Sequence, residues 1–432
     1  MDIQNAAKTA RATSFKLQAL SSDVKNEALS AIAQALKDNS NQIIQANLGD
    51  VKRAKADNIA QPLLKRLILD KSKIAQIVRG IESLIKIKDP VAQTLYALEL
   101  DKGLALYKVS CPIGVIGFIF ESRPDALVQI ATLCLKSGNV VLLKGGSEAQ
   151  ETNRTMAQLI KKASEGAGFP VGWIHLLENR AQVKEMLRLE EDIDLIIPRG
   201  SNQFVRYIMD NTSITVLGHA AGICHIYIDE DVDAKMAVEI VVDSKCQYVA
   251  VCNALETLLI HRSVAGELLP QLKEALQQRQ VELRGCAETA RIIKVNPATE
   301  QDWKTEYLDY ILSIRVVDSL QQAINHINYY GSGHTDAIIT NKTKNASNFL
   351  NIVDSANVFW NCSTRFSDGY RYGFGAEVGI STNKIHARGP VGLEGLLIYK
   401  WKLLGTGQTV AAYSGNEAKE FTHKYLDTYY NL

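Results

Sequence analysis

A cysteine followed directly by an asparagine is the first place where this sequence could do chemistry. The stretch YVAVCNALETLLIH, at residues 248–261, places Cys252 between two apolar runs. A thiol in such surroundings usually packs as a small hydrophobe. A reactive thiol needs positive charge or a helix end nearby, because its ordinary pKa of about 8.5 must fall. The surroundings of Cys252 alone are consistent with two interpretations, a core residue and a nucleophile.

A glycine-containing turn follows one of the apolar runs. In VVLLKGGSEAQETN a strand is expected at 140–143, and Lys144, Gly145 and Gly146 come directly after it, before a helix near Glu148. A lysine, glycines and a helix amino terminus together suit an anion. Ser147 stands where a carboxylate would repel a 2′-phosphate, which favours NADP(H) over NAD(H). A plain strand-to-helix turn remains the alternative, since such turns are common in α/β folds.

The same order of residues recurs one unit later. In IIPRGSNQFVRYI, at 196–208, a strand is followed by Arg199, Gly200 and Ser201 and then by a helix. Two such turns favour a nucleotide more than one does, because open parallel sheets bind ligands at the carboxyl ends of their strands. The usual dinucleotide fingerprint G-x-G-x-x-G is absent, and its nearest match, GFGAEVG at 373–379, has the wrong spacing.

Composition limits the classes of function. The 432 residues, 46% of them hydrophobic, can form two or three globular domains. The 48 basic and 47 acidic residues are interspersed, so no face for nucleic acid is expected. The sequence has no signal peptide and no apolar stretch of about 18 residues that could span a membrane, so a cytoplasmic location is expected.

The cysteines indicate neither a disulfide framework nor a metal site. There are seven, without any C-x-x-C pair. The densest cysteine and histidine group, GHAAGICHIYID, contains Cys224 and His225, with His219 nearby. Adjacent residues of a strand point to opposite faces, so these two side chains should not share a ligand. We expect no metal.

The periodicity predicts an α/β protein. The first hundred residues have helical spacing, and short β-branched runs then alternate with helical segments. This alternation predicts parallel sheets covered by helices. Two domains are expected, with a boundary near residue 245, and two alternating segments, LALYKV and EGLLIYKWKL, look like strands of an antiparallel arm. The strands are expected at 112–120, 139–146, 193–200, 213–218, 224–229, 255–261, 311–317, 335–340 and 356–361.

Several blocks of sequence resemble a known family. They are IGVIGFIFESRPD, LLKGGSEA, IIPRGSNQ, GICHIYID, VCNALETLLIH, YGSGHTDAIIT and the long segment FWNCSTRFSDGYRYGFGAEVGISTNKIHARGPVGLEGL. Together, from about residue 5 to 408, they resemble the gamma-glutamyl phosphate reductases of the aldehyde dehydrogenase superfamily. DSKCQY, LIIPRGSNQ and RFSDGYRYG look closer to the reductase half of the bifunctional pyrroline-5-carboxylate synthase.

The resemblance implies an aldehyde-dehydrogenase-like fold with an oligomerisation arm. It implies a dinucleotide-binding domain over 1–245, with an arm strand near 100–112 inserted, and a catalytic domain over 246–375. A return segment over 376–432 would carry the second arm strand near 394–404. A homo-oligomer is implied as well, and the pathway leaves room for a glutamate 5-kinase as a second partner.

The resemblance also implies roles for individual residues. Cys252 matches the nucleophile, and Lys144 with Ser147 matches the adenosine-ribose contact. The PRGS turn, with Arg199, Gly200 and Ser201, matches the loop that faces the pyrophosphate. Glu306 matches the glutamate that holds the nicotinamide ribose. The segment VLGHAAG, at 216–222, stands where aldehyde dehydrogenases carry ELGG, so their general-base glutamate is missing.

The implied reaction is the NADPH-dependent reduction of L-glutamyl 5-phosphate to L-glutamate 5-semialdehyde and phosphate, a step of proline biosynthesis. Cys252 would form a thioester, which NADPH reduces. A missing base fits this chemistry, because activated water would hydrolyse the thioester. The amide of Cys252 and the Asn253 side chain or amide are candidates for binding the oxyanion.

Six further positions are candidates for binding the substrate or its phosphate. Arg123 would bind the phosphate or the oxyanion, and its alternative is a residue that caps the following helix. Arg365, with Ser363 and Thr364, would hold the α-carboxylate, and Asp368 or Glu377 would meet the α-amine. The sequence does not say whether His386 and Arg388 face a ligand or another subunit.

Two other functions compete with this interpretation. One is an NAD(P)-dependent aldehyde dehydrogenase that acts on a free aldehyde, against which the missing glutamate argues. The other is a catalytically inactive scaffold subunit of the same fold, against which the intact Cys252, Lys144 and GAEVGIST block argue.

Overall fold

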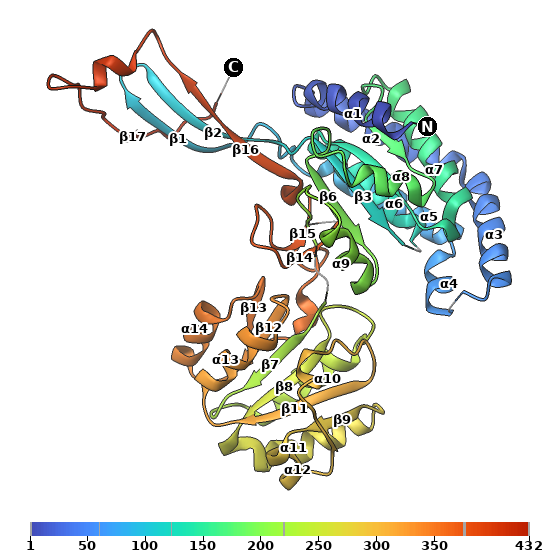
Figure 1. Ribbon diagram of the computed structural model, residues 1–432, viewed down its shortest axis with the longest axis vertical. Helices are drawn as coiled ribbons and strands as arrows, with labels where there is room; N and C mark the ends of the chain where they lie inside the picture. Colours follow the sequence, from blue (N-terminus) through green and yellow to red (C-terminus); the bar gives the residue numbers. More distant parts are fainter. Residues whose placement is uncertain (1, 60, 122, 219–220, 375–376, 431–432) are drawn as a thin grey trace. The chain divides into compact units, whose positions relative to one another are not determined.

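The computed structural model describes residues 2–59, 61–121, 123–218, 221–374 and 377–430, and the chain forms two compact units (Figure 1). The first unit comprises residues 1–200, 207–216 and 392–432, and the second comprises 201–206 and 217–391. The sequence placed the boundary near residue 245. The second unit begins earlier because the strand Cys224–Ile228 pairs with Leu255–His261, so both belong to one sheet.

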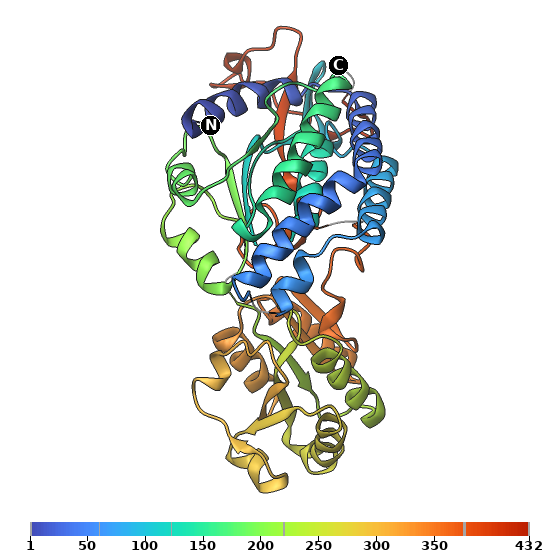
Figure 2. The same ribbon diagram turned by 90° about the vertical axis from the view of Figure 1, so that its right-hand side faces the viewer.

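Amphipathic helices form most of the first unit's surface, as their spacing predicts. The amino terminus of α1 is capped by Asp2, that of α2 by Ser21 and that of α5 by Asp70, each through a side-chain oxygen. Figure 2 shows α2 and α5 side by side. The helices are α1 Ile3–Leu17, α2 Ser22–Asp38, α3 Ser40–Ala56, α4 Gln61–Leu67, α5 Lys71–Lys86, α6 Pro124–Ser137, α7 Gln150–Gly166 and α8 Arg180–Met186, and α9 Asn202–Asp210 extends across both units.

The sheet of the first unit has the strand order of a nucleotide-binding half. Its strands are β3 Val115–Phe120, β4 Val140–Lys144, β5 Ile174–Leu176 and β6 Leu195–Arg199. They are parallel and lie in the order β5-β4-β3-β6. The chain order reverses between β3 and β6, and nucleotides bind in the crevice at such a switch point. Phe120 lies opposite Arg199 there.

An antiparallel arm completes the first unit (Figure 1). Its strands are β1 Thr94–Asp101, β2 Leu104–Pro112, β16 Leu397–Leu404 and β17 Lys424–Tyr425, in the order β16-β2-β1-β17. Gly103, at a φ of 72°, closes the tight turn from β1 to β2. The two predicted arm strands are therefore confirmed and pair with each other. The sequence missed β1 and β17.

The second unit is built on a seven-stranded parallel sheet. The order is β10-β9-β11-β8-β7-β12-β13, which confirms the strands expected between 224 and 361. The run at 213–218 makes only one bridge, from Ile196 to Val216, so the strand expected there is wrong. The strands are β7 Cys224–Ile228, β8 Leu255–His261, β9 Glu282–Gly285, β10 Asn296–Pro297, β11 Ile311–Val317, β12 Thr335–Ile339 and β13 Asn357–Trp360, and β14 Gly379–Ser381 pairs with β15 Gly389–Val391.

Helices cover both faces of this sheet, which explains why its strands are apolar runs without alternation. They are α10 Ala234–Cys246, α11 Arg262–Gln277, α12 Ala287–Ile292, α13 Leu320–Tyr330 and α14 Thr343–Ile352. Leu258 lies in the core on one face and Leu259 in the core on the other. The segment 377–391 also belongs to this unit, and the chain returns to the first unit at residue 392.

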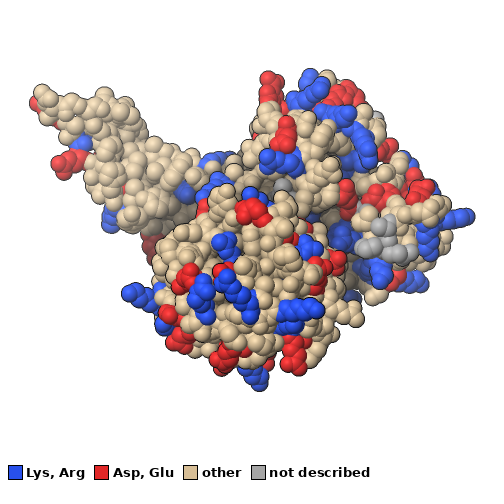
Figure 3. Space-filling view, turned by 60° about the horizontal axis from the view of Figure 1, so that its bottom comes forward, with Lys and Arg blue, Asp and Glu red and all other residues tan. Residues whose placement is uncertain are grey.

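The surface has mixed charge. On the face that Figure 3 shows, Lys and Arg are interspersed with Asp and Glu. None of the described helices is both long and apolar enough to cross a membrane.

A buried ion pair joins α10 to β8. Lys245 Nζ lies 2.7 Å from Glu256 Oε2, and both side chains are fully buried. Glu256 also accepts a hydrogen bond from the Leu308 amide. Burial raises the pKa of Glu256, and the ammonium of Lys245 opposes that rise. Each charge therefore depends on the other for its place in the core.

We expect Lys245→Met to lower the free energy of unfolding by about 3–5 kcal/mol, because it leaves the Glu256 carboxylate buried without its cation. Urea unfolding measures the change. Lys235→Met is the matched control, since Lys235 is exposed on the same helix and its loss should change stability by less than about 0.5 kcal/mol. Equal midpoints for the two variants would contradict the prediction.

Candidate active site

Cys252 lies in a turn directly before β8. The Ala254 amide donates to the Val251 carbonyl at 3.1 Å and closes this turn. Cys252 is partly exposed, whereas Cys224 and Cys134 are fully buried. Burial raises the pKa of Cys224 well above its usual value, so that thiol stays protonated. Among these three, only Cys252 has the access that a nucleophile needs.

A glycine backbone presses against Cys252. A Cβ atom at Gly222 would lie 2.2 Å from the Cys252 carbonyl oxygen and 2.6 Å from its Cα. No larger residue fits there without a shift of the backbone. The segment 216–222, in which the general-base glutamate is missing, thus ends in contact with the thiol residue. His219 and Ala220 of that segment lie outside the described residues.

The sequence analysis did not single out His334, although it lies in the block YGSGHTDAIIT. Its Nε2 atom is 3.1 Å from the Cys252 sulfur, and its side chain is fully buried. Cys252 precedes β8, His334 precedes β12, and β7 lies between these two parallel strands. The sequence contained one signal that could have found His334. It directly precedes an expected strand, and Cys252 also lies just before an expected strand.

Arg365 brings positive charge close to Cys252. Its Nε donates to Gln247 Oε1 at 2.9 Å. Burial lowers the pKa of Arg365, the neighbouring Arg371 lowers it further, and the Cys252 sulfur is among the groups that raise it. Arg365 is thus a buried cation that directly follows Thr364, whose hydroxyl bonds the carbonyl of Asn253, and this position fits its predicted role toward an anionic substrate.

The other polar residues predicted near the substrate bond to the protein itself. Thr364 Oγ1 donates to the Asn253 carbonyl at 2.8 Å, and Ser244 Oγ donates to Ser363 Oγ at 3.0 Å. Asn253 Nδ2 donates to the Ser367 carbonyl at 2.7 Å. Asn253, Ser363 and Thr364 are all buried. Their geometry favours positioning of the Cys252 turn and of Arg365 over direct contact with a ligand.

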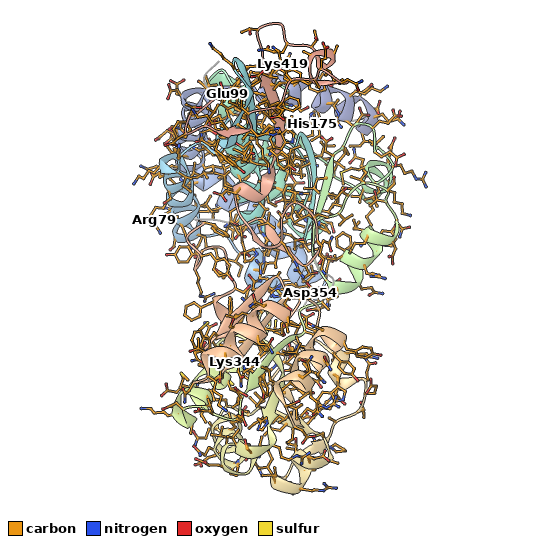
Figure 4. The ribbon with its side chains drawn as sticks, turned by 90° about the vertical axis from the view of Figure 1, so that its left-hand side faces the viewer. Arg79, Glu99, His175, Lys344, Asp354 and Lys419 are labelled. Carbon is orange, nitrogen blue, oxygen red and sulfur yellow. The ribbon has the colours of Figure 1, made fainter. Side chains whose placement is uncertain are left out.

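Glu377 and Arg388 hold loops of the second unit. Glu377 Oε2 accepts a hydrogen bond from the Gly369 amide at 2.8 Å. One oxygen of the carboxylate that was predicted to bind the α-amine therefore already has a partner within the protein. Arg388 Nη1 lies 3.2 Å from Asp354 Oδ1, in the loop after α14 (Figure 4). Arg388 therefore has a structural partner within its own unit.

In the first unit the predicted cofactor residues lie at the carboxyl ends of the strands. Arg123 occupies the N-cap position of α6, directly after β3, and its side chain is exposed. Arg199 ends the neighbouring strand β6, and Gly200 follows it. The two arginines therefore lie at the switch point of the sheet, where the phosphates of a dinucleotide bind.

A shallow depression lies at the ends of β4 and β5. Lys144, which ends β4, is largely buried, and its Nζ donates to the Gly145 carbonyl. Burial lowers the pKa of Lys144. The side-chain oxygen Oδ1 of Asn153 is buried without a hydrogen-bond partner in the described part of the chain. The depression is lined by Gly145, Gly146, Ser147, Gln150, Asn153, Leu176, Leu177 and Glu178.

These residues fit an adenosine ribose, since hydroxyl, amide and carboxylate groups meet beside apolar leucines. In the second unit, Glu306 accepts a hydrogen bond from Asn202, and Ser201 Oγ accepts from the Phe204 amide at 3.3 Å.

The residues that the structure describes include no group of three or more His, Cys, Asp or Glu side chains that could hold a metal.

We expect Gly222→Ala to destabilise the second unit by roughly 1–3 kcal/mol, because the new methyl group overlaps the Cys252 backbone. Thermal unfolding measures the effect. In Gly266→Ala, the control, the methyl group meets nothing within 4 Å on helix α11, and stability should stay equal or rise. A Gly222→Ala protein as stable as this control would contradict the prediction.

Comparison with known proteins shows the family. The aldehyde dehydrogenase family model matches residues 1–289. The chain is 61% identical over its full length to the gamma-glutamyl phosphate reductase of Acetivibrio thermocellus, also covered completely. It is 52% identical to that of Nostoc punctiforme, covering 98% of this chain and 97% of the relative.

Solved structures agree. A crystal structure of the gamma-glutamyl phosphate reductase from Thermotoga maritima matches with a TM-score of 0.93 and 40% identity, covering 95% of this chain and 100% of that one. An acetylating aldehyde dehydrogenase from Geobacillus thermoglucosidasius, at 17% identity and a TM-score of 0.63, shares the fold, over 94% of this chain and 97% of that one. The chain belongs to the gamma-glutamyl phosphate reductase family of the aldehyde dehydrogenase superfamily, whose fold it has.

Proposed function

We propose that the protein reduces L-glutamyl 5-phosphate to L-glutamate 5-semialdehyde and phosphate, with NADPH as the reductant and Cys252 as the nucleophile. Family membership supports a reductase of proline biosynthesis. The single observation that carries the nucleophile is the partly exposed Cys252, held in the turn that the Ala254 amide closes directly before β8.

The acyl phosphate of the substrate is a good electrophile, so the protein must supply a nucleophile and bind the charges that develop. The sulfur of Cys252 attacks the acyl carbon and phosphate departs, which leaves a thioester. Arg365 can attract the anionic substrate. The backbone amide of Cys252 and Asn253 are the local candidates for the oxyanion, although one Asn253 Nδ2 hydrogen already bonds Ser367. No described residue of the segment 216–222 carries a carboxylate that could activate water against the thioester.

For the cofactor, the strand ends of the first unit fit best. Lys144, Gly145, Gly146 and Ser147 would hold the adenosine ribose, and the turn with Arg199, Gly200 and Ser201 would face the pyrophosphate. Arg123, beside Arg199 at the switch point, remains our candidate for phosphate or oxyanion binding. Glu306 would hold the nicotinamide ribose. NADPH, when bound, supplies the hydride that reduces the thioester.

The proposed nucleophile is tested in the reverse direction, by following NADP⁺ reduction with pyrroline-5-carboxylate and phosphate. Cys252→Ala should lose the activity by roughly a thousandfold or more, because the thioester cannot form. Cys246→Ala, another partly exposed cysteine of the second unit, is the control and should keep most of it.

Two outcomes would contradict the proposal. Equal rates for Cys252→Ala and the wild type would show that this thiol is not the nucleophile. Turnover that does not depend on phosphate would identify the protein as a dehydrogenase of free aldehydes instead.

The cofactor preference can be tested at Ser147, which is exposed beside Lys144. Ser147→Glu should raise the KM for NADPH by roughly fivefold or more and leave that for NADH nearly unchanged, since the carboxylate repels only the 2′-phosphate. Ser147→Gln, which adds the same bulk without charge, should discriminate less. If the glutamate and glutamine variants have the same NADPH-to-NADH ratio, the 2′-phosphate does not bind there.

For the arm we propose a second copy of this chain as the partner. The outer edge of β16 pairs with no other strand among the described residues. An unpaired edge with apolar side chains is a template for another strand. In Figure 3 the arm at the upper left carries few charges. Its exposed apolar residues are Leu95, Ile398, Tyr399, Trp401, Leu403 and Tyr425.

Three expectations from the sequence stay predictions. They are a glutamate 5-kinase as a further partner, the cytoplasmic location and the closer likeness to the synthase reductase half. Relatives that match over nearly the whole of this chain and of their own length are named gamma-glutamyl phosphate reductase.

A further inference from the structure

We propose that His334 is the catalytic group that takes the proton from the Cys252 thiol and later returns it, which rests on the proposed role of Cys252. The Nε2 atom of His334 lies 3.1 Å from the Cys252 sulfur. The imidazole is fully buried, and the thiol is partly exposed. A fully buried imidazole therefore contacts the sulfur of a residue that is itself partly exposed.

The contacts of the other ring nitrogen suit the tautomer that this role requires. Cys224 Sγ donates its only hydrogen to the Cys252 carbonyl at 3.2 Å. Toward His334 Nδ1, 3.8 Å away, that sulfur can only accept. Thr335 Oγ1, 2.8 Å from Nδ1, has lone pairs that can accept as well. The proposed role uses the tautomer in which Nδ1 donates to Thr335 Oγ1, so that the lone pair of Nε2 faces the thiol of Cys252.

The backbone around His334 is held at several points. The Asn357 side chain and backbone amide both donate to the His334 carbonyl, at 3.0 and 3.1 Å. Gly333 before it has a φ of 69°, a conformation that favours glycine. A Cβ atom at Gly331 would lie 2.5 Å from the Ile327 carbonyl. The imidazole is thus preorganised, as a proton acceptor must be.

The proton can be followed through the reaction. When Cys252 attacks, the S–H bond breaks, a C–S bond forms, and the proton passes to His334 Nε2. Phosphate leaves with the electron pair of its C–O bond and takes a proton from water. Once the acyl carbon has been reduced, the C–S bond breaks, the sulfur keeps the electron pair, and Nε2 returns the proton. The net uptake of one proton from water matches reduction of an acyl phosphate to an aldehyde.

The reactivity of the thiol tests this role without substrate or cofactor. In the full chain, alkylation of Cys252 by iodoacetamide at pH 7 is followed on its peptide by mass spectrometry. His334→Gln should slow it at least about tenfold, since a thiol of pKa about 8.5 is only a few per cent thiolate at that pH. The reductase kcat should fall roughly 10²- to 10⁴-fold, the usual range for general acid–base catalysis.

His326→Gln is the matched control, because His326 is another buried histidine of the second unit, in contact with Arg315. It should leave the alkylation rate unchanged even if it lowers stability. Folding is checked by circular dichroism. If His334→Gln does not fold, Thr335→Val decides, because it keeps the imidazole and removes the hydroxyl beside Nδ1.

The results separate this inference from the proposed function. An unchanged alkylation rate in folded His334→Gln, or in Thr335→Val where the first does not fold, overturns the role of His334 while Cys252 stays the nucleophile. Full activity in Cys252→Ala overturns the proposed function itself. Slower alkylation with loss of kcat supports the proton transfer, since a purely structural histidine would not change the reactivity of one thiol.

Discussion

The amino ends of adjacent parallel strands meet at one edge of the second sheet, and the site depends on this register. β7 lies between β8 and β12, so the turn before β8 and the residue before β12 come together around the start of β7. Cys252, His334 and Cys224 occupy these three positions. They are far apart in the sequence, and only the parallel pairing makes them neighbours.

Close packing keeps the site in that arrangement. Gly222 presses against the backbone of Cys252, and Thr364 bonds the carbonyl of Asn253. In the same unit the Lys245–Glu256 ion pair joins α10 to β8, which buries two charges. A rigid support of this kind suits a nucleophile whose sulfur must meet an acyl carbon at a defined distance.

The candidate site residues lie at opposite ends of the strands in the two units. In the first unit the expected cofactor residues lie at the carboxyl ends, where loops and helix amino termini offer N–H groups to phosphates. In the second unit the thiol lies at an amino end, so the crevice rule for open sheets does not locate it. The carboxyl-end rule for parallel sheets would thus have pointed to the edge of the second sheet opposite Cys252.

The sequence by itself determined the class of fold, most strands of the two parallel sheets, two of the four arm strands and the family, since strand and helix periodicity and dense motifs are local in the chain. The tertiary structure decided the rest. It assigned β7 to the second sheet, removed the strand at 213–218, and turned Ser363 and Thr364 inward to bond the protein. It also brought His334 to Cys252, 82 residues away in sequence. The physical reason is that pairing between strands and side-chain contacts depend on partners distant in the chain, which local periodicity does not encode.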